Sequence, residues 1–191
     1  MRRVPLHLPL VLLSVLATPA AAEWATGIQY FSGGPAADLG SVDLISNVPC
    51  RGTGRPLDLT DVLGPANDKY VTIGEGGVLI VDFAHDVVDG PGPDVRIYVS
   101  CNAALEPGHA WASPDGVNFT IPLGAVNQAP YVEFDLAGTG IASTDYIKIT
   151  DDVGTLAPGL AQAIDVDAVL SLHDPVAVAP TTWGAIKSRL R

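Results

Sequence analysis

The chain has 191 residues, of which 48% are hydrophobic, and its 10 basic and 21 acidic side chains give a net charge of −11. A chain of this length can bury one substantial core, and its hydrophobic content excludes a disordered protein. The acidic balance argues against nucleic acid and anionic membranes as partners, because both require clustered cations. The acids comprise 17 Asp and only 4 Glu. Since Asp favours turns, caps and cation sites whereas Glu favours helices, the excess of Asp predicts a turn-rich β domain.

Residues 1–22 have the pattern of a cleavable signal peptide. Arg2 and Arg3 precede an apolar run over Leu6–Leu16, and small residues follow at Ala20–Ala22. This order fits signal peptidase, with Glu23 as the new N-terminus. The apolar run is too short for a membrane anchor. We therefore expect a secreted, extracellular or periplasmic protein with no transmembrane segment in the mature chain.

Short β-rich runs separated by Gly, Pro, Asn and Asp dominate residues 23–172, which we expect to form one domain. Alternation in Val95–Val99 would place residues 95, 97 and 99 on one face, and Ile147 and Ile149 would point inward with Lys148 outward. Many strands without alternating helices predict an all-β antiparallel sandwich or barrel. The expected strands are Trp24–Phe31, Val42–Asn47, Tyr70–Ile73, Gly77–Phe83, Asp94–Cys101, Ala110–Ser113, Val117–Pro122, Tyr131–Asp135, Tyr146–Thr150 and Ala163–Leu172.

Helical periodicity is scarce. Leu57–Leu63 could form one turn, with Asp58 or Thr60 as its cap. Residues 173–191 are expected to be a linker followed by a short C-terminal helix over Thr181–Arg191. In that helix Thr182 would cap, and one face would carry Trp183, Ile186 and Leu190.

The chain contains two cysteines, Cys50 and Cys101. An even number in an exported chain predicts a disulfide. Such a bond would close a loop of about 50 residues. By restricting the unfolded chain it would stabilise the fold by roughly 3–4 kcal/mol. The alternative is two buried free thiols.

Four segments in order resemble a known family. They are the Gly-rich strand segment Val71–Phe83, the turn and strand Val88–Tyr98, the Ser-Pro-Asp-Gly segment Ser113–Gly124, and the pair Tyr146–Asp151 and Ile164–Val169. Together they resemble secreted bacterial cell-surface β-sandwiches of the discoidin-like and galactose-binding-like type. The resemblance implies a jelly roll over roughly residues 40–172, binding loops at one end of the sandwich, and commonly one structural calcium ion.

The aspartates supply candidate calcium ligands, because calcium takes six to eight hard oxygen ligands. Asp89-Gly90-Pro91-Gly92-Pro93-Asp94 presents two carboxylates on a tight loop, and Asp165 and Asp167 would share one side of a strand. The alternative is ordinary capping of turns by Asp side chains. The candidate metal ligands are Asp86, Asp89, Asp94, Asp151, Asp152, Asp165 and Asp167.

Three residues are candidates for ligand binding. Trp111 could stack on a sugar ring, although the favoured alternative is that it belongs to the core. Arg51 and Arg55 form a cationic loop that could meet an anionic ligand or simply be solvated. We found no hydrolase, zinc-protease, P-loop or dinucleotide motif, and predict no catalytic residues.

These features favour a secreted or cell-surface binding or adhesion module that is calcium-stabilised and recognises a glycan or a surface protein. One alternative is a structural extracellular or envelope protein without a small ligand. The other is a carbohydrate-active enzyme, which needs two carboxylates about 5–10 Å apart. In a chain with 21 acidic residues, such pairs of carboxylates occur by chance, so they are not evidence for an enzyme.

Overall fold

The computed structural model describes residues 22–34, 57–100, 108–127, 130–152 and 163–173, together with the backbone of two short strands at 42–43 and 48–49. The predicted signal peptide up to residue 21, both cysteines, Arg51, Arg55 and the predicted C-terminal helix lie outside these residues, so their assignments stay predictions. In the described part no helix is long and apolar enough to cross a membrane.

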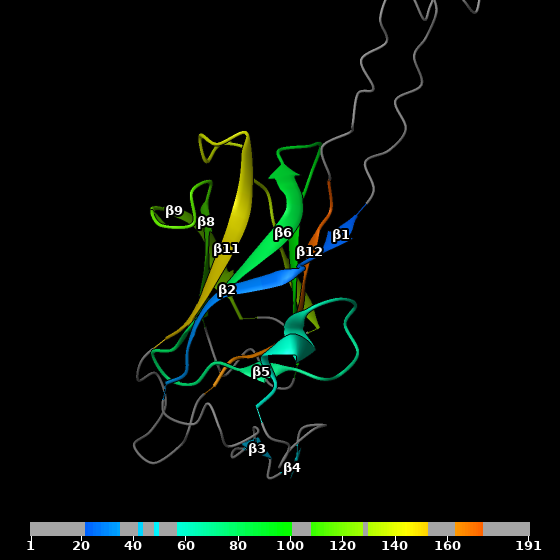
Figure 1. Cartoon of the computed structure of the whole chain (residues 1–191), viewed down its shortest axis with the longest axis vertical. Coiled ribbons are helices and arrows are strands. Elements are labelled where there is room, and N and C mark those ends of the chain that lie inside the picture. The colour runs from blue at the N-terminus through cyan, green and yellow to red at the C-terminus, as the bar shows by residue number, and fades with distance from the viewer. Residues whose placement is uncertain are drawn as a thin grey trace, which may run out of the picture.

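The described residues form an antiparallel β-sandwich, which confirms the all-β prediction (Figure 1). Sheet A has the strand order β1-β12-β7-β10, with β5 also paired to β12, and sheet B has the order β2-β6-β11-β8-β9. From β6 to β12 the chain crosses between the sheets at every connection except the β8–β9 hairpin, as expected for a jelly roll. The elements are β1 (Glu23–Trp24), β2 (Gly27–Ser32), β3 (Val42–Asp43), β4 (Val48–Pro49), η1 (Leu59–Val62), β5 (Val71–Thr72), β6 (Val78–Val88), β7 (Val95–Ser100), β8 (Gly108–Ser113), β9 (Ile121–Val126), β10 (Tyr131–Phe134), β11 (Ser143–Asp151) and β12 (Asp165–Ser171).

The core lies between the two sheets and follows the predicted alternation. In β7 the inward residues Val95, Ile97 and Val99 are buried, whereas Arg96 and Tyr98 point to the outer face. In β11 the buried residues Ile147 and Ile149 face the core, with the half-buried Lys148 between them. Each inward aliphatic side chain contributes about 1.5–3 kcal/mol through its burial.

The predicted strand Trp24–Phe31 is two strands in different sheets. Trp24 in β1 pairs with Leu170 in sheet A, whereas Gly27 in β2 pairs with Asp82 in sheet B. At this crossing Gly27 lies against the Asp82 carboxylate, so a Cβ there, 2.1 Å from an oxygen of the Asp82 side chain, would oblige that side chain to move. The predicted helical turn at Leu57–Leu63 is a 3-10 turn, η1, which Asp58 caps by accepting a hydrogen bond from the Thr60 amide.

Antiparallel pairing gives the sandwich two distinct ends. At the first, named here the β6–β7 end, β6, β10 and β12 finish and β7 and β11 begin. At the second, the β11–β12 end, β11 and β7 finish and β12, β6 and β8 begin. The eleven residues of β6 separate the two ends by roughly 30 Å.

Candidate functional site

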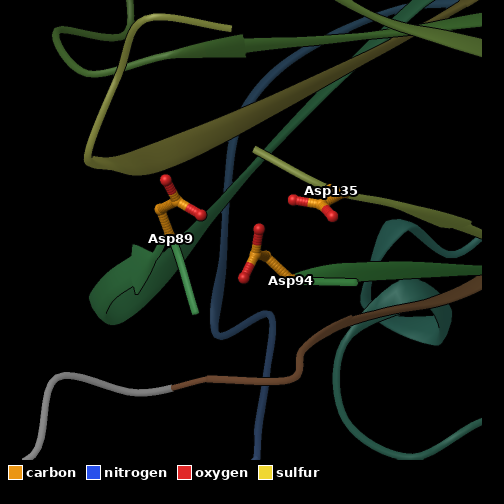
Figure 2. Close-up of side chains that lie close together, drawn as sticks. All are labelled: Asp89, Asp94 and Asp135. Carbon is orange, nitrogen blue, oxygen red and sulfur yellow. The ribbon is translucent and has the colours of Figure 1, made fainter. Parts of the chain in front are cut away.

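Three carboxylates meet at the β6–β7 end (Figure 2). Asp89 follows β6, Asp94 precedes β7 and Asp135 follows β10, and one oxygen of each lies within 4.8 Å of the others. The loop that joins Asp89 to Asp94 turns tightly through Gly92, whose φ is +89°. Two of the seven predicted metal ligands are therefore together, and Asp135 joins them from a strand that is distant in sequence.

Asp94 is fully buried in this cluster and already has two backbone partners. Its Oδ1 accepts a hydrogen bond from the Gly90 amide at 2.7 Å, and its Oδ2 accepts one from the Leu136 amide at 2.7 Å. His173 Nε2 lies 3.9 Å from the same Oδ1. These bonds tie the β6–β7 loop to the segment after β10, which gives Asp94 a structural role whether or not a cation binds.

The donor set of the cluster fits a hard cation. It consists only of carboxylate oxygens, which calcium prefers, and each oxygen of Asp94 keeps a second lone pair beyond its amide bond. Asp89 and Asp135 are exposed, which leaves room for the water and carbonyl ligands that would complete a shell of six to eight oxygens.

Asp86 lies on β6 at the same end but outside this three-residue group. It accepts a hydrogen bond from Ser143 Oγ at 3.0 Å. It also faces Asp145, whose pKa is raised by burial and by the hydrogen bond and charge of Asp86.

Three other predicted ligands lie at the opposite, β11–β12 end. Asp165 accepts a hydrogen bond from Thr72 Oγ1 at 2.6 Å, and Asp152 lies 2.9 Å from His109 Nδ1. Asp151 is 4% exposed. Its Oδ2 accepts a hydrogen bond from the Ile164 amide at 2.6 Å, whereas its Oδ1 is buried and has no hydrogen-bond partner among the described residues. Burial raises the pKa of Asp151 to about 6, and the charges of Asp152 and Glu75 add to the rise. The six predicted ligands described so far thus lie at two opposite ends of the sandwich and do not form one site.

Asp167, the last of the seven, lies on the sheet A side of the molecule. It sits where the register of β12 shifts against β7. Its carboxylate accepts hydrogen bonds from the amides of Asn67 and Asp68, both at 3.1 Å. Burial raises its pKa against the lowering effect of these two bonds. The buried carboxylate therefore holds the loop at residues 66–68 against β12.

The outer face of sheet A carries a row of three aromatic side chains, Trp24, Tyr98 and Tyr131. Tyr98 is in the middle, with its ring centroid 5.6 Å from that of Trp24 and 5.7 Å from that of Tyr131. Arg96 packs over Tyr131 at 4.5 Å and donates a hydrogen bond to Tyr98 Oη. Tyr131 is 40% exposed. We call these three residues the aromatic row.

A depression of about 440 Å³ borders the aromatic row toward the β11–β12 end. Its polar lining comes from Asn67, Asp68, Ser100 and Asp167, and Tyr98 and Pro130 supply apolar surface. Aromatic surface beside a few polar groups in a concave site is typical of small-molecule binding sites. No local sequence pattern predicts this site as a whole, although the alternation of β7, which points Tyr98 outward, is a signal for part of it.

Trp111 lies on the other side of the sandwich, on the outer face of sheet B. Lys148 Nζ lies 4.8 Å from the Trp111 ring centroid and 5.0 Å from that of Phe119. Burial among these rings lowers the pKa of Lys148. Trp111 is half-buried under this lysine, so it belongs neither to the core between the sheets nor to the aromatic row.

Comparisons with known proteins leave the family open. No protein family matches the chain, and no curated protein matches it. Among solved structures, the chain is similar to the X-ray structure of GH31 CBM32-2 bound to GalNAc. The identity is 15% and the TM-score is 0.38, over 75% of this chain and 98% of that one. A likeness this weak does not decide function, which has to be inferred from the chain's own site geometry.

Proposed function

We propose that this protein is an exported glycan-binding module, and that the aromatic row and the adjoining depression form its binding site. The observation that carries the proposal is three aromatic rings in contact beside a concave surface with polar groups. Export is supported by the signal-peptide pattern of residues 1–22.

The chemistry of the site suits a sugar. The C–H face of a pyranose ring is apolar and can stack on an aromatic ring, while its hydroxyl groups need hydrogen-bond partners at the edge. Tyr131 offers exposed aromatic surface at one end, and Asn67 and Ser100 offer polar groups in the depression. Arg96 Nε donates a hydrogen bond of 2.8 Å to the Glu133 carboxylate. The guanidinium held in this way packs over the Tyr131 ring and keeps it in place.

Replacing the exposed aromatic ring tests the site directly. A glycan array identifies the ligand that binds best, and calorimetric titration then compares the wild type with Tyr131→Ala. We expect the affinity to fall by about two- to tenfold, because an aromatic contact contributes about 0.5–1.5 kcal/mol beyond its buried area. The melting temperature should barely change, since Tyr131 is partly exposed on an edge strand.

The matched control is Tyr30→Ala. Tyr30 is 52% exposed and lies on β2, in sheet B. Its loss should leave affinity unchanged. Equal loss in both variants, or no binding to any glycan on the array, would contradict the proposal, and the latter result would favour a purely structural protein. Hydrolysis of an array glycan would instead indicate a carbohydrate-active enzyme.

We also propose that calcium binds at Asp89, Asp94 and Asp135. The support is the oxygen-only donor set, drawn from three segments within 4.8 Å. A bound ion would add to the tie that Asp94 makes between the β6–β7 loop and the segment after β10, and would offset the mutual repulsion of the three carboxylates.

The calcium proposal predicts a metal-dependent melting temperature. Calcium at 100 times its dissociation constant should stabilise the fold by about 2.7 kcal/mol relative to EGTA. Asp135→Asn should abolish most of this gain, whereas Asp152→Asn, at the other end of the sandwich, should keep it. Asp94 is unsuitable for the test, because its removal also leaves two buried amides without acceptors. A gain that disappears in Asp152→Asn and survives in Asp135→Asn would place the ion elsewhere.

A further inference from the structure

We propose that the site selects branched glycans over unbranched chains with the same backbone. The main chain would lie along the aromatic row, and a short side branch would enter the depression. This inference rests on the proposed glycan-binding function and specifies its ligand class. It follows from the directions in which the two parts of the site run and from the residue at which they meet.

The aromatic row runs across the strands of sheet A. Tyr131 on β10 pairs directly with Tyr98 on β7, and Trp24 comes from β1, on the other side of β12. The rings of Trp24 and Tyr98 nevertheless lie 5.6 Å apart, because the residue of β12 that pairs with Tyr98 is the small, fully buried Ala168. Since β1 and β10 are the two ends of this strand order, the row is long enough for a stretch of chain and not only for one terminal sugar.

The depression leaves the row in a different direction. Three consecutive residues of β7, Tyr98, Val99 and Ser100, line it. It therefore extends along β7 toward the β11–β12 end, whereas the row crosses that strand. Tyr98 is the middle residue of the row and also lines the depression. The two parts together form a T, which is the outline of a main chain that carries a side branch.

The depression suits a short branch. Its volume of about 440 Å³ lies toward the lower end of the range of about 300–1,000 Å³ that is typical of small-molecule sites. Its polar groups suit hydroxyl groups, which both donate and accept hydrogen bonds. Each oxygen of Asp167 accepts one amide hydrogen bond and keeps a second lone pair. Asn67 Oδ1 accepts a hydrogen bond from the Lys69 amide, which orients the Asn67 side-chain amide as a donor.

The fold fixes both parts of the site before a ligand arrives. The Asp167 carboxylate holds the loop at residues 66–68 against β12. Arg96 donates a hydrogen bond to Tyr98 Oη and packs over the Tyr131 ring. A ligand that fills both parts therefore gains the contacts of the depression at little cost in ordering the protein. An unbranched chain on the row does not make those contacts.

The test measures, by calorimetric titration, the affinities of three matched pairs of soluble oligosaccharides with β-1,4-linked backbones. The pairs are cellotetraose and its xylosylated form, the xyloglucan heptasaccharide; mannopentaose and its galactosylated form; and xylotetraose and its arabinosylated form. In at least one pair we expect the branched member to bind at least about tenfold more tightly than the unbranched member. A gain below tenfold in every pair would overturn the inference.

Variants then assign the preference to the depression. Ser100→Leu adds bulk on the face of β7 that Tyr98 shares, and should bring the affinity ratio of the pair close to one. Ala66→Leu fills the depression from the loop and should do the same, which provides a second variant if Ser100→Leu does not fold. Tyr131→Ala should weaken both members and keep the ratio, and Tyr30→Ala in sheet B should change neither affinity. A ratio that survives in both filling variants would overturn the inference, because the branch would then bind elsewhere.

The remaining outcomes separate this inference from the proposed function. If the array shows binding but none of the six probes binds, the branch selection is overturned and glycan binding stays intact. If none of the six probes binds and the array is also blank, the proposed function fails and the selection fails with it.

Discussion

At the scale of single residues, the aspartates of this chain differ by the partners of their carboxylates. Asp115 is exposed and accepts hydrogen bonds from the amides of Val117 and Asn118, which hold its pKa well below the usual range. Asp94 is buried and satisfied by two amides. Asp151 is buried, with one oxygen hydrogen-bonded and the other without a partner in the described part of the chain. The same residue type therefore serves as turn cap, loop tie and destabilising charge.

Asp151 predicts a distinct pH dependence of stability. Its folded pKa of about 6 lies above the ordinary 3.8, so the folded state holds the proton more tightly than the unfolded state. The stabilisation is fully present below pH 3.8 and is lost as the pH rises through about 6. A difference of about two pKa units corresponds to about 3 kcal/mol.

Asp151→Asn mimics the protonated carboxyl, since its amide oxygen can still accept the Ile164 hydrogen bond. The measurement is urea unfolding with EDTA present. The free energy of unfolding of the variant, relative to that of the wild type, should rise by about 3 kcal/mol between about pH 4 and about pH 7. Any constant difference in packing cancels in this comparison. A stability difference that is independent of pH would contradict the prediction. Asp115→Asn is the control, because the Asp115 carboxylate stabilises the fold in its charged form and its pKa is lowered from 3.8. That contribution is lost only as the pH falls below about 4, so the stability of this variant relative to the wild type should hardly change between about pH 4 and about pH 7.

At the scale of elements, the strands could be predicted because their faces differ in burial. Val95–Val99 and Tyr146–Thr150 alternate in sequence as they do in the sheets. The break between β1 and β2 could not be predicted, because Trp24 and Gly27 belong to one apolar run. Only the strand pairing shows that they enter different sheets. The predicted strand Val117–Pro122 begins at Ile121, since the amides of Val117 and Asn118 are taken by Asp115.

The candidate sites depended on pairing that no local pattern contains. The aromatic row joins residues 24, 98 and 131, which meet because β1 and β7 flank β12 and Tyr131 pairs with Tyr98. Asp135 joins Asp89 and Asp94 for the same reason, since β10 ends beside the start of β7. Conversely, the sequence lists Asp151 and Asp152 beside Asp86 and Asp89 as candidate metal ligands. The structure separates the two pairs by the length of β6, because β11 ends where β6 begins.

At the scale of the whole molecule, the candidate sites lie on separate surfaces. The carboxylate cluster lies at the β6–β7 end, the depression lies on the outer face of sheet A toward the other end, and Trp111 with Lys148 lies on the outer face of sheet B. A sugar on the aromatic row would therefore have no direct contact with a cation at the β6–β7 end. This separation makes the calcium and glycan predictions independently testable, because a structural ion would change the melting temperature without being a ligand of the sugar.

The net charge of −11 also acts on the molecule as a whole. Excess charge of one sign destabilises a compact state through self-repulsion, and salt screens it, with a Debye length of about 3 Å at 1 M. We expect sodium and potassium chloride alike to raise the melting temperature by a few degrees at about pH 8, and to do so much less near pH 4, where carboxyl groups are about half protonated. The gain outweighs any loss from screening exposed ion pairs such as Arg96–Glu133, because pairs of that kind contribute about 0–1 kcal/mol each. A melting temperature that falls with salt at pH 8 would show that attractive pairs, and not the excess of carboxylates, dominate the electrostatics of the fold.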